Sequence, residues 1–269
     1  MRRWSLVACI PIVSVCWAGA PETPVLEAKL VETHAFRGRG GAGQGLAIGK
    51  EFYYGSNGSN ICRFDRKWNL IETKRVQIDG VNHLGAIDYH DGVIWGGFLH
   101  GPEKGKHDPK LNRGIVATLR ASDLTVTKTW DITRDVKWID PVCFDGTHLW
   151  VGDLSDLGIH RYRLTGDGRL ERTGVLRTPR ELHFSQGIRV VGGCLYSIHT
   201  FGKKEGLFEF IIPQKLAATP CLPTRSWNVR RTGMHLEGFG FVPGHPNQIW
   251  EAQGNHVDRY ELEGLPKAP

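Results

Sequence analysis

The chain has 269 residues, of which 23% are charged, and a formal net charge of +6. This length is within the range of a single domain. The mild basic excess does not argue for a nucleic-acid partner, and none of the sequence signatures of DNA- or RNA-binding modules is present.

The first twenty residues have the pattern of a secretory signal peptide. Arg2 and Arg3 precede an apolar run that ends in the small-residue sequence Ala18-Gly19-Ala20. Cleavage after Ala20 would leave residues 21–269 as one domain in a secreted or periplasmic location. The apolar run is too short to span a membrane comfortably, and no later segment is longer, so stable membrane insertion is not expected.

Cleavage would also leave four cysteines. They are Cys62, Cys143, Cys194 and Cys221. An oxidising compartment permits disulfides, and Cys194–Cys221 is the pair that we would favour, whereas free buried thiols explain the four equally well. Their spacings match no zinc-binding motif.

The chain after the signal repeats one pattern five times. Residues 27–36, EAKLVETHAF, form a first predicted strand. Each repeat then has a polar residue, a short apolar strand often begun by glycine, a tight turn, a strand with aromatic residues, and further strands. In chain order the repeats are QGLAIGKEFYYGSNGSNICRFDRKWNLIETKRVQI (44–78), HLGAIDYHDGVIWGGF with an insertion and RGIVATLRASDLTVTKTWDI (83–132), DPVCFDGTHLWVGDLSDLGIHRYRLTGDGRLERTGVL (140–176), SQGIRVVGGCLYSIHTFGKKEGLFEFII (185–212) and HLEGFGFVPGHPNQIWEAQGNHVDRYEL (235–262).

Repeats of this length with four short strands each are typical of the blades of a β-propeller. We therefore expect an all-β fold, a β-propeller with five four-stranded blades. The fifth repeat has only three strands, so residues 27–36 would supply its outer strand and close the ring. Six blades remain an alternative if residues 27–38 belong to a degenerate blade.

A propeller would bring polar residues of all five repeats to one mouth of its channel. The innermost strand of each blade lines the channel and the next strand returns antiparallel to it, so first-strand starts and second-strand ends share a face. At the strand starts stand Gln44, His83, Asp140, His183, Gln186, His235 and Glu237. At the strand ends stand Ser56, Asn57, His100, Asp153, Ser155, His199, Thr200, Glu251 and Gln253.

These residue types suit acid–base chemistry or a metal, whereas hydrogen bonding between blades would explain any single histidine. We interpret His34, His90, His148, His160, His245 and His256 as surface residues. Imidazoles with carboxylates suit a divalent cation such as zinc, manganese or calcium. The candidate metal ligands are His83, Asp140, His235 and Glu237, and the candidate catalytic groups are His83, His199, His235 and Glu237. A metal-free site with a histidine base stays open.

The loops predicted at this mouth are basic. Residues 100–113 carry Lys104, and Lys203 follows the second strand of the fourth repeat. Such a collar favours an anionic ligand, whereas ordinary solvated loops are the alternative. We expect a monomer that binds a small molecule or saccharide. The candidate substrate-binding residues are Gln44, His100, Asp153, His183, Gln186, Glu251, Lys104 and Lys203.

Two stretches resemble known propellers. QGLAIGKEFYYGSNGSNICRFD and FSQGIRVVGGCLYSIHTFG resemble the repeated units of plant-type glutaminyl cyclotransferases, which are secreted five-bladed propellers. HLEGFGF resembles an opening found in lactonase-like propellers, which usually have six blades. The acidic residue of the first family's first blade is replaced here by Tyr54-Gly55-Ser56, and its FGEGL unit by His83-Leu84-Gly85-Ala86. The resemblance implies the architecture rather than the reaction.

The lead hypothesis is a secreted propeller enzyme. It would be a metal-assisted hydrolase or lyase that acts on an anionic small molecule or saccharide at the channel mouth. A glutaminyl cyclotransferase-like acyl transfer is one alternative. A propeller that binds a ligand or protein without catalysis is the other, because propellers serve all three purposes.

Overall fold

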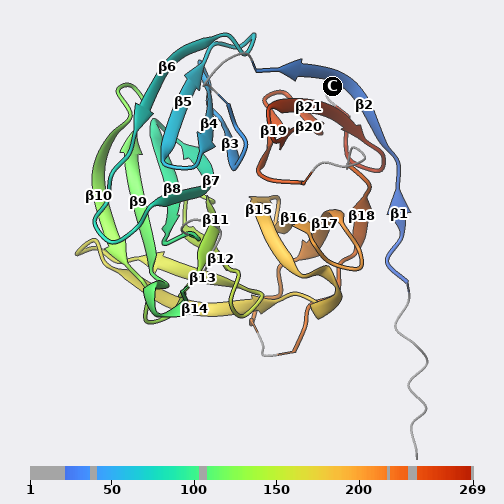
Figure 1. Cartoon of the computed structure of the whole chain (residues 1–269). Coiled ribbons are helices and arrows are strands. Elements are labelled where there is room, and N and C mark those ends of the chain that lie inside the picture. The colour runs from blue at the N-terminus through green and yellow to red at the C-terminus, as the bar shows by residue number, and fades with distance from the viewer. Residues whose placement is uncertain (1–21, 37–40, 103–107, 217–218, 230–234, 268–269) are drawn as a thin grey trace, which may run out of the picture.

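The computed structural model describes residues 22–36, 41–102, 108–216, 219–229 and 235–267. Within these residues the strands form five antiparallel sheets arranged in a ring, a five-bladed β-propeller (Figure 1). The all-β prediction, the number of blades and the use of an N-terminal strand in the last blade are confirmed. None of the described helices is long and apolar enough to cross a membrane.

The strands of each blade follow one another outward from the axis. The first blade is β3 (Gly45–Ile48), β4 (Tyr53–Asn57), β5 (Asn60–Phe64) and β6 (Leu70–Arg75), and the second is β7 (His83–His90), β8 (Val93–Leu99), β9 (Gly114–Arg120) and β10 (Thr125–Asp131). The third blade is β11 (Ile139–Phe144), β12 (His148–Asp153), β13 (Gly158–Leu164) and β14 (Leu170–Arg177). Two single turns of 3-10 helix, Pro109–Leu111 and Arg180–Leu182, complete the loops.

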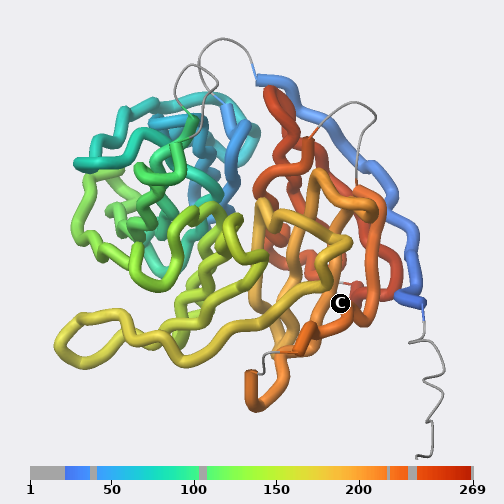
Figure 2. Tube along the Cα trace, turned by 60° about the horizontal axis from the view of Figure 1, so that its bottom comes forward, coloured from blue at the N-terminus to red at the C-terminus, as the bar shows by residue number. Residues whose placement is uncertain are grey.

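The last two blades share the N-terminal segment. The fourth blade is β15 (Phe184–Val191), β16 (Cys194–Thr200), β17 (Gly206–Ile211) and β18 (Arg225–Trp227), and the fifth is β19 (Phe239–Val242), β20 (His245–Gln253), β21 (His256–Leu262) and β2 (Ala28–Ala35). Strand β2 pairs antiparallel with β21 and runs along the outside of the C-terminal blade (Figure 2). Before it, β1 (Val25–Leu26) pairs parallel with β18, a contact that the sequence did not predict.

The glycines that open the predicted repeats let the inner strands converge. A Cβ on Gly238, before β19, would lie 2.6 Å from the Cα of Gly45 at the start of β3. That separation is much shorter than a van der Waals contact, so the two backbones can meet only without side chains at this point. Hydrophobic side chains of neighbouring blades fill the space between the sheets, for example Tyr54 and Ile61 of the first blade against Ile94 of the second.

The channel is closed on the axis by Arg189 of β15. Its guanidinium donates hydrogen bonds to the carbonyl oxygens of Leu46 in β3 and Ile87 in β7. The same side chain forms an ion pair with Asp88, at 3.4 Å, and lies 5.6 Å from the ring centre of Phe239 in β19. Arg189 and Asp88 are each only 7% exposed. One buried side chain therefore joins four of the five blades.

All four cysteines of the described chain are free thiols, so the Cys194–Cys221 disulfide is not formed. The Cys221 thiol lies 3.8 Å from the carbonyl oxygen of Ile211, the residue that Cys194 faces across β16 and β17. Cys194 packs with the core between the fourth and fifth blades, and Cys221 with the core between the third and fourth. The two thiols thus lie on opposite faces of one sheet.

Arg189→Met is expected to lower the free energy of unfolding by about 3–5 kcal/mol, because it leaves Asp88 buried without its partner. Asp88→Asn added to Arg189→Met should recover part of that loss, since the amide oxygen can still accept the hydrogen bond from the Phe144 amide. Urea unfolding of the two variants measures both effects. A double variant no more stable than the single one would contradict the central role of this ion pair.

Candidate functional site

Four of the five inner strands place a carboxyl or amide side chain at one mouth of the channel. Gln44 precedes β3, Asp140 lies in β11, Gln186 lies in β15 and Glu237 precedes β19. The second blade has buried Leu84 at this position and instead contributes His83, whose Nε2 lies 2.6 Å from Gln44 Oε1. We call Gln44, His83, Asp140, Gln186 and Glu237 the polar neck. These predicted residues come from all five blades.

Asp140 depends on a glycine of the neighbouring blade. Its Oδ1 accepts a hydrogen bond from the Ala86 amide at 3.1 Å and lies in the space that a Cβ on Gly85 would occupy. The residue is only 5% exposed. Burial raises the pKa of Asp140 to about 7, although the hydrogen bond from Ala86 opposes this. Asp140 can therefore gain and lose a proton near neutral pH.

Glu237 lies close enough to Asp140 for the two charges to repel each other. Burial, and then this repulsion, raise the pKa of Glu237 to about 9. Behind it, Glu251 of β20 is fully buried, and its Oε1 lies 3.4 Å from the Glu237 amide. Burial also raises the pKa of Glu251 well above its ordinary value. At neutral pH Glu237 therefore keeps its proton, whereas Asp140 is partly ionised.

The neck also contains a buried acceptor without a partner. Gln186 is 9% exposed, and its Oε1 makes no hydrogen bond within the described protein. His83 on the other side is held neutral, because burial lowers its pKa. The polar neck therefore consists of amide groups, a neutral imidazole and carboxyl groups. This set suits a ligand that carries N–H donors.

His199 and His183 are placed differently from the neck. His199 is fully buried, its ring lies 5.6 Å from that of Phe208, and its Nδ1 donates to the carbonyl oxygen of His183 at 3.3 Å. Burial lowers the pKa of His199 to about 4. His183 has a φ of 60°, so His199 supports a turn with a left-handed residue at the rim.

The remaining candidates lie around the mouth or behind it. His235 is exposed, and its ring centre is 4.6 Å from that of Phe201. His100 follows β8 and is half-buried. Asp153, 5% exposed, accepts from the Ser155 amide and hydroxyl, so it stabilises its own turn.

Of the two predicted basic residues, only Lys203 belongs to the part of the chain that the structure describes. Lys203 is exposed and lines a surface pocket of about 600 Å³ together with Val25 and Trp227. Lys104 lies outside the described residues. The side chains that are seen to line the neck are therefore uncharged or acidic.

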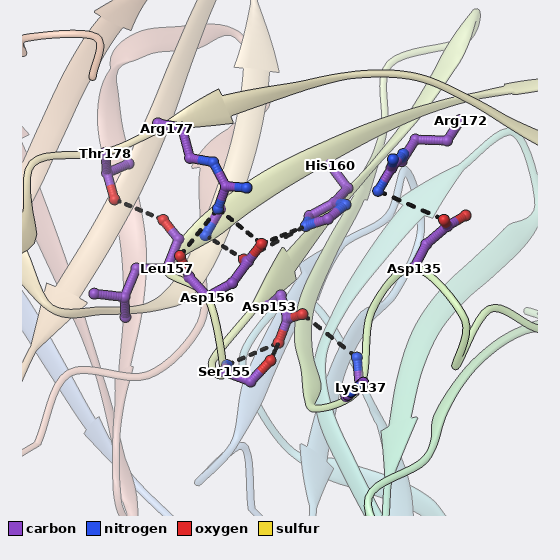
Figure 3. A network of polar contacts seen from close by, with 11 residues as sticks. Asp135, Lys137, Asp153, Ser155, Asp156, Leu157, His160, Arg172, Arg177 and Thr178 are labelled. Atoms are coloured by element: carbon purple, nitrogen blue, oxygen red, sulfur yellow. Dashed lines mark hydrogen bonds and ion pairs between the residues drawn. The ribbon is translucent and has the colours of Figure 1, made fainter. Parts of the chain in front are cut away.

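A possible metal-binding group of the described chain lies elsewhere, in the third blade. One carboxylate oxygen each of Asp153 and Asp156 and a ring nitrogen of His160 lie within 4.8 Å of one another (Figure 3). His160 is only 1% exposed, so its prediction as a surface residue was wrong. It faces inward because β13 is covered by the adjacent blade, a relation that the sequence of one repeat does not reveal.

Contacts within the protein account for the clustering of Asp153, Asp156 and His160 without a bound ion. Asp156 forms an ion pair with Arg177 at 2.7 Å and accepts from the Gly158 amide (Figure 3). Burial would raise the pKa of Asp156, but hydrogen bonds from His160 and Arg177 lower it to about 2. The arginine already supplies the compensating charge. The predicted metal ligands His83, Asp140, His235 and Glu237 form no comparable group among the described residues, and their metal role stays a prediction.

Sequence reasoning predicted His235 but missed two aromatic residues, Trp138 and Phe184, that have the same spacing from the neck. Trp138, Phe184 and His235 each stand two residues before a neck residue, namely Asp140, Gln186 and Glu237. Phe184 and Gln186 both lie in β15, whereas Trp138 precedes β11 and His235 precedes β19. The pattern aromatic-x-polar, repeated in three consecutive blades, was the signal available for these positions.

No protein-family model and no curated protein matches the chain. Solved structures do match its fold. A Myxococcus xanthus glutaminyl cyclase is similar with a TM-score of 0.65 and 11% identity over 91% of this chain and 100% of that one. A structure described as a putative gluconolactonase has a TM-score of 0.52 and 15% identity over 81% and 72% of the two chains. At these identities the likeness concerns the fold.

The raised carboxyl pKa values predict a pH-dependent stability. The folded protein keeps protons on Asp140 and Glu237 that the unfolded chain releases near pH 4, so the free energy of unfolding should fall as pH rises from about 4 towards about 9. In Asp140→Asn/Glu237→Gln this fall should be smaller, because both groups no longer titrate. Urea unfolding across this pH range tests it. If the free energy of unfolding fell with pH in the same way in the wild type and the double variant, the raised pKa values of Asp140 and Glu237 would be contradicted.

Proposed function

We propose that the protein is an enzyme that cyclises N-terminal glutamine by intramolecular acyl transfer, using Asp140 and Glu237 as an acid–base pair. The observation that carries the proposal is the position of these two carboxyl groups in the neck, with pKa values raised into the range where protons are exchanged at neutral pH. The likeness in fold to a glutaminyl cyclase supports this choice of reaction.

The chemistry of the neck favours a substrate with an amine. A partly ionised Asp140 attracts an ammonium group, and the partnerless amide oxygen of Gln186 can accept an N–H hydrogen bond. An anion would meet the negative charge of Asp140 whenever that group is ionised. The proposal therefore replaces the expected anionic ligand by a cationic or amine-bearing one.

The proposed reaction needs one proton acceptor and one proton donor. The substrate's α-amine attacks the carbon of its own side-chain amide, and the carbon–nitrogen bond to the departing ammonia breaks. Asp140, whose pKa is the lower of the two, takes the proton from the attacking amine when ionised. Glu237 stays protonated and donates to the leaving nitrogen. Both protons are returned by exchange with water after the products leave.

The pattern of residues 1–20 supports a second part of the proposal, namely that the enzyme works outside the cytoplasm. Substrates would then be the N-termini of secreted or periplasmic peptides.

Asp140→Asn and Glu237→Gln should each lower kcat by about 10²- to 10⁴-fold, the usual effect of losing one acid–base group. Ammonia release from a glutamine dipeptide amide, followed at neutral pH, measures this. Glu51→Gln is the matched control, because Glu51 is exposed in the turn between β3 and β4 on the opposite face and should leave the rate unchanged. A folded wild-type protein that releases no ammonia would refute the proposal.

A metal-assisted hydrolase is the second candidate, favoured by the convergence of Asp140, Glu237 and Glu251. Oxygen and nitrogen donors of this kind suit zinc, manganese or calcium, and bound metal would take the place of the carboxyl protons. The likeness in fold to a putative gluconolactonase makes a lactone a sensible test substrate.

A chelator separates the two candidates. Acyl transfer by the carboxyl pair should be unaffected by EDTA, and the protein should bind no stoichiometric zinc, manganese or calcium by elemental analysis. The hydrolase predicts one equivalent of metal, lost in His83→Ala but kept in the control His34→Ala, together with EDTA-sensitive lactone hydrolysis. A non-catalytic propeller predicts neither reaction.

A further inference from the structure

An arc of aromatic rings lies along the mouth beside the polar neck. We call Trp138, Phe184, Phe201 and His235 the aromatic arc. Ring centres are 6.2 Å apart for Trp138 and Phe184, 6.4 Å for Phe184 and Phe201, and 4.6 Å for Phe201 and His235. The arc therefore runs without a gap from the third blade to the fifth.

Three members of the arc are close in the chain to residues of the neck. Trp138, Phe184 and His235 precede Asp140, Gln186 and Glu237 by two residues in three adjacent blades. Two residues of extended chain span at most about 7 Å. A ligand whose amine reaches the neck would therefore place its next group, one peptide unit away, against these rings.

Phe201 is the least expected member of the arc. Its φ is 62°, a left-handed conformation that is unfavourable for a bulky residue, and its side chain is 51% exposed. Half of the ring is therefore not buried in the fold, so packing only partly offsets the backbone strain. Strain of this kind at a rim, with an exposed ring, is typical of a binding site.

The turn around Phe201 is fixed by local contacts. Its amide donates to Glu205 Oε1 at 2.8 Å, and the Lys203 amide donates to the carbonyl oxygen of Glu181 at 3.0 Å. Gly202 lies so close to that carbonyl that a Cβ would be 2.6 Å from it. The exposed ring is thus held by a rigid turn rather than carried on a loose one.

We propose that the aromatic arc is a specificity site that receives an apolar or aromatic side chain at the second residue of the substrate peptide, with Phe201 as its principal contact. The inference rests on the proposed function for the identity of the first residue and its amine. Aromatic rings bind such side chains by burying apolar surface and by edge or stacked contacts. The aromatic arc determines which peptides bind most tightly, whereas the polar neck catalyses the reaction.

The test uses peptides that bind with or without turnover. Calorimetry compares Ala-Phe-NH2 with Ala-Gly-NH2, neither of which can cyclise, and ammonia release compares Gln-Phe-NH2 with Gln-Gly-NH2. We expect the phenylalanine peptides to be favoured by about tenfold or more in affinity and in kcat/KM, as one buried ring commonly provides.

Variants at Phe201 assign the preference to the arc. Phe201→Asn keeps a residue that tolerates the left-handed conformation, so the preference should vanish while the melting temperature stays the same or rises. Phe201→Tyr should retain the preference. Ile211→Ala, at an exposed apolar side chain of the strand β17, is the control and should change neither.

The outcomes separate the arc from the reaction. Equal binding of the two alanine peptides, an unchanged preference in Phe201→Asn, or a marked loss of stability in that variant would overturn the arc as a specificity site. A preference for Ala-Phe-NH2 without ammonia release from either glutamine peptide would support the arc and refute the proposed reaction. Ammonia release that is indifferent to the second residue would refute the arc alone.

Discussion

The buried guanidinium of Arg189 is the constraint on which the rest of the propeller depends. Five strands that meet at an axis leave carbonyl oxygens without strand partners, and Arg189 donates to those of two neighbouring blades while pairing with Asp88. It lies three residues deeper in β15 than Gln186, so the channel is closed below the neck. Burial of the carboxyl groups Asp140 and Glu237 is the main cause of their raised pKa values.

The architecture could be predicted because its signals are local and repeated. Glycine before an apolar strand marks the points where inner strands converge, and the missing fourth strand of the last repeat indicated the role of residues 27–36. The pairing of β1 with β18 had no such signal, since two residues at an edge carry no periodicity. The sequence left a Cys194–Cys221 disulfide and free thiols equally open, because it does not show that the two residues lie on opposite faces of one sheet.

The residues of the polar neck could be predicted from the sequence, but the positions of the residues around the neck could not. Gln44, Asp140, Gln186 and Glu237 were found because inner-strand starts must share a mouth. Second strands are covered on both sides by neighbouring blades, so alternation does not reveal where a polar residue points. His199 therefore faces Phe208 in the core, and His160 of a third strand is buried as well. Of the aromatic arc only His235 was predicted, because the prediction considered ligand and acid–base residue types alone.

The pairing of β2 with β21 has a consequence for how the ring assembles. Residues such as Ala28 and Leu262 are neighbours in one sheet although nearly the whole chain separates them. Contacts of such long range raise the contact order and slow folding, because a large loop must close before they form. During synthesis β2 emerges long before β21, so its hydrogen-bonding edge has no partner until the last strand appears. The nascent chain is thus an unclosed ring with an unpaired strand edge. A chaperone that binds this edge would protect the chain from aggregation until the ring closes.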